Sequence, residues 1–249
     1  MSTLNQTLKD RNIKALILDL DGVVTQTARV HAQAWKRMFD AYLKKRGEEE
    51  GKDYAPLEIE TDYREHIDGI PRYDGVRNFL QSRGITLPEG DPTDDIGEET
   101  VAGLGNLKNM YFQELLKQDG VDEYKDTIAW LQQQRSKGMR TAVISASKNC
   151  VDVLHAAGIA KLFEEHVDGL QSAEMGLKGK PAPDIFLEAA RRLGVSPQEA
   201  AIFEDARKGV QAGKAGGFGL VVGIDRTRDA EGLKASGADM VIQEFPSEV

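Results

Sequence analysis

Residues 17–26 read ILDLDGVVTQ, and this stretch decides the fold: an apolar run ends in two carboxylates separated by one leucine. Residues 15–20 (ALILDL) are almost continuously apolar and lead into a turn that contains Gly22, which is typical of a strand buried in a parallel sheet. Side chains alternate faces along a strand, so Asp19 and Asp21 would point the same way if the strand continued through both. Such crowding raises the pKa of one carboxyl group unless a cation or a proton is supplied nearby.

Strands and helices alternate along the chain after residue 122. Strands are predicted at 139–145, near 166–167, and at 200–204, 218–224 and 239–242, and helices at about 122–137, 150–157, 183–194 and from 207 onward. This alternation implies right-handed crossovers and a parallel sheet that is covered on both faces. The sequence therefore predicts an α/β fold with a doubly wound parallel sheet.

Residues 28–121 have a different character, typical of a helical insert. Apolar residues recur at helical spacing in 30–46, and 75–84 and 107–118 also read as helices. The stretches 46–56 (RGEEEGKDYAP) and 86–100 (TLPEGDPTDDIGEET) are predicted to be loops. We expect a core domain from residues 1–27 and 122–249 and a helical cap domain from residues 28–121, with linkers near 22–27 and 118–124.

Composition excludes several functional classes. The chain has 249 residues and a formal net charge of -9, so no basic field attracts nucleic acid or an anionic membrane. Cys150 is the only cysteine, and no window approaches the roughly 18 apolar residues of a membrane span. We expect a cytoplasmic monomer with a small-molecule substrate, with neither nucleic acid nor membrane as a partner.

Polar groups also lie at two other predicted strand ends and at one helix entrance. Ser145 begins SASKN, Lys180 lies in GKPAPD before a proline, and Glu204 and Asp205 end the strand AAIFE. Each has an ordinary explanation, since Ser145 and Asp205 could cap helices and Lys180 could be a surface lysine. Strand ends of an open parallel sheet converge on its ligand site, and these three signals, following the Asp19–Asp21 motif in this order, favour a function. Carboxylate oxygens are also the ligands that a magnesium ion prefers.

The four signals together resemble the signatures of the haloacid dehalogenase superfamily of phosphotransferases. The resemblance spans nearly the whole chain and implies a Rossmann-like core, an essential Mg²⁺ and a phospho-aspartate intermediate. It implies that Asp19 is the nucleophile and Asp21 the general acid and base, while Ser145 and Lys180 bind the transferring phosphoryl group. It also implies a metal shell made of the groups Asp19, Asp21 (through its backbone carbonyl), Glu204 and Asp205.

Residues 30–36, 69–76, 107–111 and 145–149 resemble the cap and hinge motifs of the sugar phosphomutases of this superfamily, which interconvert β-glucose 1-phosphate and glucose 6-phosphate. This resemblance implies that His31 and Lys108 lie near the sugar and that Arg72 holds the phosphate that is not being transferred. The remaining implied substrate-binding residues are Thr27 at the hinge and, in the core, Ser147, Lys148 and Asn149. In the ordinary interpretation, His31 packs in the core and Lys108 is a solvated helix lysine.

Three features depart from the mutase pattern: Gln26, Gly75 and a longer cap between residues 45 and 61. The alternatives are a sugar-phosphate phosphatase, in which water takes the phosphoryl group, and a non-catalytic sugar-phosphate-binding protein. A dehalogenase would not need Asp21 as a proton donor. A protein that had lost catalysis would be expected to lack Asp19 or Asp21, and the chain has both.

Overall fold

A computed structural model describes residues 3–247, except the side chain of Asp119. The chain divides into two compact units, 1–26 with 121–249, called here the sheet unit, and 27–120, called the helical unit. The sheet unit contains the strands β1 (Ala15–Asp19), β2 (Arg140–Ile144), β3 (Glu165–Val167), β4 (Ala200–Glu204), β5 (Leu220–Ile224) and β6 (Met240–Ile242). Their order is β3-β2-β1-β4-β5-β6, and every pairing is parallel.

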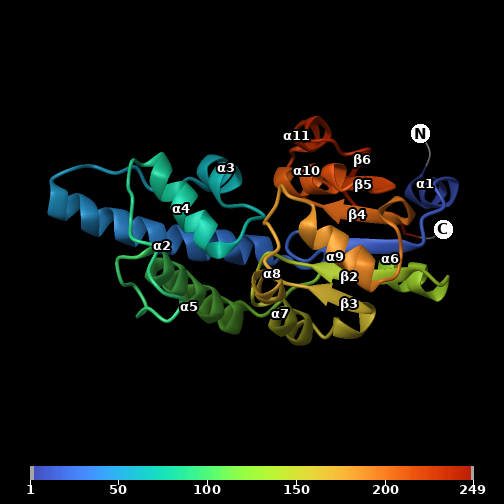
Figure 1. Cartoon of the computed structure of the whole chain (residues 1–249), viewed down its shortest axis with the longest axis horizontal. Helices are drawn as coiled ribbons and strands as arrows, with labels where there is room; N and C mark the ends of the chain where they lie inside the picture. Colours follow the sequence, from blue (N-terminus) through green and yellow to red (C-terminus); the bar gives the residue numbers. More distant parts are fainter. Residues whose placement is uncertain (1–2, 248–249) are drawn as a thin grey trace. The chain divides into compact units, whose positions relative to one another are not determined.

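Helices cover both faces of this sheet (Figure 1). The sheet unit contains α1 (Leu4–Asp10), α6 (Lys125–Ser136), α7 (Cys150–Ala156), α8 (Gly169–Glu174), α9 (Asp184–Arg192), α10 (Arg207–Ala215) and α11 (Ala230–Ala235), with short 3₁₀ turns η2 (Ala160–Leu162) and η3 (Pro197–Glu199). Ile17 packs with Phe186 of α9 on one face, while Phe203 meets Trp130 of α6 at 5.3 Å between ring centroids on the other. The predicted α/β fold with a doubly wound parallel sheet is therefore confirmed.

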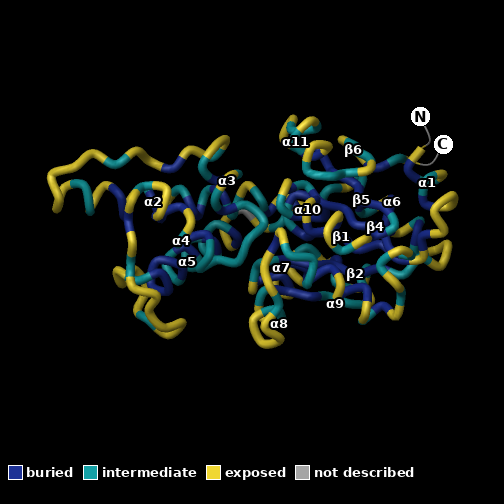
Figure 2. Tube along the Cα trace, turned by 45° about the horizontal axis from the view of Figure 1, so that its top comes forward, coloured by how far each residue is buried: buried dark blue, intermediate teal, exposed yellow. Residues whose placement is uncertain are grey.

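Burial explains why the strand sequences are continuously apolar. All five residues of β1, β4 and β5 are buried, and Figure 2 shows these strands in dark blue inside the sheet unit. A strand that is buried on both faces has no position left for a solvated side chain. Polar groups consequently gather where the strands end.

The helical unit is formed by α2 (Thr27–Glu50), the π-helical turn η1 (Ile59–Tyr63), α3 (Arg64–His66), α4 (Arg72–Ser82) and α5 (Val101–Asp119). Its core includes Trp35, Met38 and Phe39 of α2, which pack with Phe79 of α4. No helix in residues 3–247 combines the length and the apolar character needed to cross a bilayer.

The structure differs from the sequence prediction at the end of α2. Residues 46–56 were expected to be a loop, but α2 continues through Glu50. Ion pairs between residues four apart explain the extension, since Arg46 contacts Glu50 at 2.7 Å and Lys45 contacts Glu49 at 3.7 Å. The prediction was therefore wrong for residues 46–50.

Three short helices of the sheet unit, α1, α8 and α11, were not predicted, and neither were η1 and α3 of the helical unit. In α1 and α8, a side chain caps the first turn by accepting backbone N–H groups. Thr3 accepts the backbone N–H of Gln6 at 3.3 Å at the start of α1. Asp168 accepts the N–H groups of Leu170 and Gln171, both at 2.9 Å, at the start of α8. Such caps are readable from sequence, but helices of six or seven residues are too short for a periodic apolar pattern.

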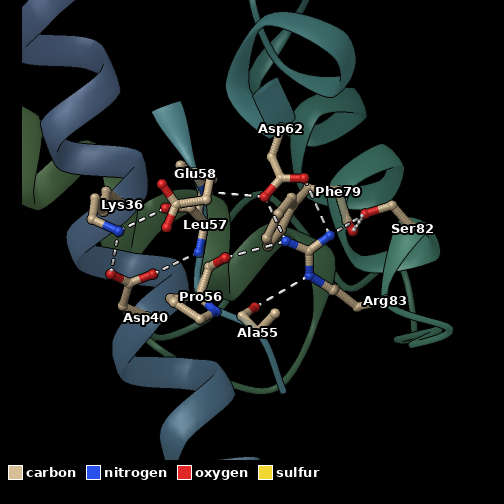
Figure 3. Close-up of polar contacts among 10 residues, drawn as sticks. All are labelled: Lys36, Asp40, Ala55, Pro56, Leu57, Glu58, Asp62, Phe79, Ser82 and Arg83. Carbon is tan, nitrogen blue, oxygen red and sulfur yellow. Dashed lines mark hydrogen bonds and ion pairs between the residues drawn. The ribbon is translucent and has the colours of Figure 1, made fainter. Parts of the chain in front are cut away.

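Residues 52–58 return along α2 and are held by side chains at two points (Figure 3). Leu57 is fully buried, its N–H donates to Asp40 at 2.8 Å, and its carbonyl accepts from Lys36 at 2.6 Å. Arg83, just after α4, forms a fork with Asp62 and donates to the carbonyls of residues 55 and 56. The long segment after α2 is thus tied to both α2 and α4.

The Arg83–Asp62 pair generates a prediction about stability. Both side chains are only 16% exposed, so Arg83→Met leaves a largely buried carboxylate without its partner. We expect the free energy of unfolding to fall by about 2–3 kcal/mol, at or below the lower end of the range for breaking a buried pair. Urea titration followed by circular dichroism measures the change. Arg77→Met is the control, because its partners Asp74 and Glu89 are 46% and 64% exposed, and it should cost less than about 1 kcal/mol. Equal losses in the two variants would contradict a structural role of the Arg83 fork.

Candidate active site

The acidic motif of β1 lies at the centre of the sheet, since β1 is flanked by β2 and β4. The strand ends at Asp19, and Asp21 lies in the following turn. The backbone N–H of Asp21 donates to the Asp19 carboxylate at 3.0 Å, and the Ser145 hydroxyl donates to Asp21 at 3.1 Å. The strand does not continue through both carboxylates, so Asp19 and Asp21 are not neighbours on one face of β1. The turn gives the two carboxylates different surroundings.

Lys180 supplies a cation directly beside the nucleophile candidate. Its ammonium group donates to Asp19 at 2.6 Å and also contacts Glu204 at the end of β4. All three side chains are almost fully buried. Burial alone would lower the pKa of Lys180, but the two carboxylates hold the pKa above its ordinary value, so the lysine stays charged. The alternative of an ordinary surface lysine is therefore wrong for Lys180, which is buried beside Asp19.

The pKa of Asp19 responds to the same environment. Burial raises the pKa of this carboxyl group well above its usual value, Lys180 opposes the rise, and the charges of Glu204 and Asp21 add to it. One lysine therefore faces several carboxylates. Additional positive charge at this position would favour the ionised form of Asp19.

Two glycines make room for the acidic side chains: Gly22, which was predicted to lie in the turn, and Gly209, which was not selected from the sequence. A Cβ on Gly22, whose φ is +83°, would lie 1.8 Å from the Asp205 carboxylate. A Cβ on Gly209 would lie 1.9 Å from the carboxylate of Glu204, whose second oxygen accepts the N–H of Ala206 at 3.0 Å. Asp205 is not the cap of α10, because that position belongs to Ala206. The carboxylate of Asp205 therefore lies against the turn that carries Asp21.

These carboxylates match a divalent cation in the chemistry of their donors. Asp19, Glu204 and Asp205 offer the hard oxygen ligands that Mg²⁺ prefers. Among residues 3–247, no three side chains of His, Cys, Asp or Glu are grouped closely enough to hold a metal ion. Asp19 and Glu204 are instead both in contact with Lys180. The residues fit Mg²⁺ in kind, and binding would require their oxygens to reorient.

The loop after β2 is built around Ser145. The hydroxyl of Ser145 accepts the N–H of Ser147 at 3.0 Å, and the hydroxyl of Ser147 accepts the N–H of Asn149 at 3.2 Å. Ser145 and Asn149 are buried, whereas Lys148 is exposed. The structure thus brings Ser145 to Asp21 and places Ser147, Lys148 and Asn149 in the same loop.

The helical unit contains two cationic side chains near His31: Lys108, which is buried, and Arg72, which is partly buried. Lys108 of α5 is 3% exposed and donates to Nδ1 of His31 on α2 at 2.6 Å. Burial, Lys108 and Arg72 lower the pKa of His31 well below its usual value, so its imidazole is neutral and accepts this bond. Lys108 also lies 4.9 Å from the ring centroid of Phe112, which stacks on His31 at 4.0 Å. The interpretation of Lys108 as a solvated lysine is wrong.

Arg72 begins α4 and donates to Asn109 of α5 at 2.9 Å. Burial lowers the pKa of Arg72. Gly105 permits this approach of the two helices, since a Cβ there would lie 2.7 Å from the ring of Tyr73. Gly105 and Asn109 were not selected from the sequence, although Asn109 lies in the motif at residues 107–111 (LKNMY). Thr27, the predicted hinge residue, is the buried first residue of α2.

Comparison with known proteins agrees with this arrangement. The family model described as haloacid dehalogenase-like hydrolase matches residues 13–217. A β-phosphoglucomutase of Mycobacterium bovis is 46% identical over 236 residues, which is 94% of this chain and 90% of that protein. A β-phosphoglucomutase of Bacillus subtilis is 31% identical over 233 residues, covering 93% of this chain and 90% of the relative. The crystal structure of β-phosphoglucomutase from Clostridium difficile superposes with a TM-score of 0.72 at 27% identity, covering 93% of this chain and 91% of the other.

The parallel sheet with acidic strand ends, a serine and a buried lysine defines a class of phosphate-transferring α/β proteins. The chain belongs to the haloacid dehalogenase-like hydrolase family. The resemblance in the sequence motifs is thereby confirmed. The family relationship extends through both units, because the match to the Mycobacterium bovis relative covers 94% of the chain.

The position of Lys180 generates a prediction about pH. Lys180→Met leaves Asp19 and Glu204 buried without their cation, and we expect a loss of about 3–5 kcal/mol in unfolding free energy at pH 7.5 in EDTA. Lys180 opposes the rise that burial causes in the pKa of Asp19, so removing it raises this pKa further, and the folded variant takes up a proton at a higher pH than the folded wild type. The loss should therefore shrink at pH 5.5. Urea titrations at both pH values measure the effect, with Lys178→Met, at an exposed lysine, as the control. A loss that is independent of pH would contradict this electrostatic account.

Proposed function

We propose that this chain is a Mg²⁺-dependent phosphomutase that converts β-glucose 1-phosphate to glucose 6-phosphate through a phospho-aspartate on Asp19. The similarity to β-phosphoglucomutases over 94% of the chain supports the reaction class. The observation that carries the proposal is that each unit holds its own cationic side chains: Lys180 beside Asp19 in one, and Lys108 with Arg72 in the other. A bisphosphate intermediate has two phosphates to bind, whereas a monophosphate has one.

In the proposed first step, the carboxylate of Asp19 attacks phosphorus in line, and the sugar oxygen leaves. Lys180, already 2.6 Å from Asp19, neutralises negative charge on the phosphoryl oxygens, and the Ser145 hydroxyl offers a hydrogen bond to them. Asp21 donates a proton to the leaving oxygen and later removes one from the attacking hydroxyl. Bound Mg²⁺, held by Asp19, the Asp21 carbonyl, Glu204 and Asp205, would supply further charge neutralisation.

The helical unit is proposed to bind the substrate through the phosphate that is not being transferred. A guanidinium group such as Arg72 binds phosphate through two parallel hydrogen bonds. The neutral His31 and the buried Lys108 are proposed to contact the sugar, with Thr27 as the hinge. In the sheet unit, Ser147, Lys148 and Asn149 are proposed to contact the phosphates or the sugar.

The main alternative, a sugar-phosphate phosphatase, would use the same Asp19 and Asp21 chemistry but transfer the phosphoryl group to water. The β-phosphoglucomutase relatives at 46% and 31% identity do not favour it. A mutase must keep water from the phospho-aspartate until the sugar phosphate is bound. The proposed setting of the reaction is the cytoplasm, with the protein as a monomer.

Phosphorus NMR tests the reaction directly. With Mg²⁺, β-glucose 1-phosphate and a trace of β-glucose 1,6-bisphosphate, we expect glucose 6-phosphate with little inorganic phosphate. Arg72→Ala should lose this conversion, because one phosphate of the bisphosphate is no longer held. Arg37→Ala is the control, since Arg37 lies exposed in the same unit and pairs with Glu114. Release of inorganic phosphate without glucose 6-phosphate would favour the phosphatase instead.

The assignments of Asp19 and Asp21 make different predictions. Asp19→Asn should abolish turnover, because an amide cannot form the phosphoryl intermediate. Asp21→Asn should slow turnover on the order of 10²–10⁴-fold, the typical effect of losing general acid–base catalysis, and should still bind Mg²⁺ through its backbone carbonyl. Steady-state rates and a Mg²⁺ titration by calorimetry measure the two effects. Near-normal turnover in either variant would reject its assignment.

A further inference from the structure

The segment 122–127, where the chain re-enters the sheet unit, holds the turn that carries Asp21. The N–H of Tyr124 donates to the carbonyl of Val24 at 2.9 Å, and the hydroxyl of Thr127 donates to the carbonyl of Val23 at 2.8 Å. Val23 and Val24 are fully buried and follow Asp21 by two and three residues. The turn after β1 is therefore anchored by α6 and by the residue before it.

Arg226 in turn holds this segment. Arg226 lies just beyond the carboxyl end of β5, and its side chain is 12% exposed. One terminal nitrogen contacts both carboxylate oxygens of Asp126, at 3.1 and 3.0 Å, and the hydroxyl of Thr127 at 3.2 Å. The guanidinium group also lies 4.0 Å from the ring centroid of Tyr124. Arg226 thus contacts three residues of the segment that supports the catalytic turn.

The contacts form a continuous path toward the site. Thr127 accepts from Arg226 and donates to Val23, so its hydroxyl transmits the position of the guanidinium group to the turn. The guanidinium group therefore supports the turn that carries Asp21 through the hydroxyl of Thr127.

We infer that Arg226 is a positioning residue for acid–base catalysis, which fixes the turn of Asp21 through Thr127 and Tyr124. The inference rests on the proposed function, in which Asp21 protonates the leaving sugar oxygen. General acid catalysis requires a heavy-atom distance of about 2.6–3.2 Å to the proton acceptor, so a small displacement of the turn weakens it. A planar guanidinium group that contacts Asp126 through one terminal nitrogen, donates to the carbonyl of Gln243 through the other and lies over the ring of Tyr124 suits this task better than a flexible ammonium group.

The test compares two phosphoryl donors that differ in their need for a proton. Transfer from β-glucose 1,6-bisphosphate to Asp19 expels a sugar oxygen that must be protonated, whereas transfer from acetyl phosphate expels acetate, which leaves as the anion. In both cases the new bond joins an Asp19 oxygen to phosphorus. For Arg226→Met we expect transfer from the sugar bisphosphate to slow at least about tenfold and transfer from acetyl phosphate to change less than about twofold. Rapid-quench single turnovers with Mg²⁺ measure both rates.

Two further variants make the comparison specific. Arg207→Met is the matched control, because Arg207 forks onto Asp229 instead, and both donors should keep their wild-type rates. Thr127→Val keeps the Arg226–Asp126 pair but removes the hydroxyl that reaches Val23, and it should slow the sugar donor selectively. This variant also serves if Arg226→Met does not fold.

The possible results separate the inference from the proposed function. Equal slowing with both donors, or no slowing with either, would overturn the positioning role of Arg226. If the wild-type enzyme accepted acetyl phosphate but never transferred phosphate from the sugar bisphosphate, the proposed sugar reaction would itself be rejected. Selective slowing in both Arg226→Met and Thr127→Val supports the path from Arg226 to the turn of Asp21.

Discussion

The contact of Lys180 with two buried carboxylates is the interaction on which the rest of the site depends. Removing a carboxylate from water costs several kcal/mol unless a partner compensates it, and Asp19 and Glu204 are both almost fully buried. They share one ammonium group because β1 and β4 are neighbours in the sheet and both end at the same edge. The strand order therefore fixes which acidic groups meet. The lysine comes from the segment between α8 and α9, far from both in the sequence.

Space is the second constraint on the acidic groups. Gly22 and Gly209 stand where a Cβ would collide with Asp205 and Glu204, so the carboxylates occupy room left by missing side chains. Gly22 has a φ of +83°, which L side chains rarely adopt, and it therefore shapes the turn as well. These glycines link the backbone path of the turn to the chemistry of the site. A larger residue at either position would move an acidic group.

The helical unit solves a different electrostatic problem. Lys108 is buried against aromatic rings, and its ammonium group is bound by the neutral imidazole of His31. Arg72 is held by the uncharged side-chain oxygen of Asn109. In these two contacts the cations meet neutral groups, the imidazole of His31 and the amide oxygen of Asn109. The presence of two cationic side chains in this unit is consistent with the proposed phosphorylated substrate.

The sequence by itself determined the alternation of buried strands and helices, the doubly wound parallel sheet and the residue types at the strand ends, because burial on both faces leaves a continuous apolar pattern. The capping residues of α1 and α8 are readable from the sequence, but these helices are too short to show a periodic apolar pattern. The continuation of α2 to Glu50 depends on ion pairs within a segment whose composition is typical of a loop. Only the tertiary structure decided that Lys180 binds both Asp19 and Glu204, that Lys108 is buried, and that Arg226 supports the turn of Asp21. These contacts join residues far apart in the chain, and their geometry follows from packing, which local sequence patterns do not encode.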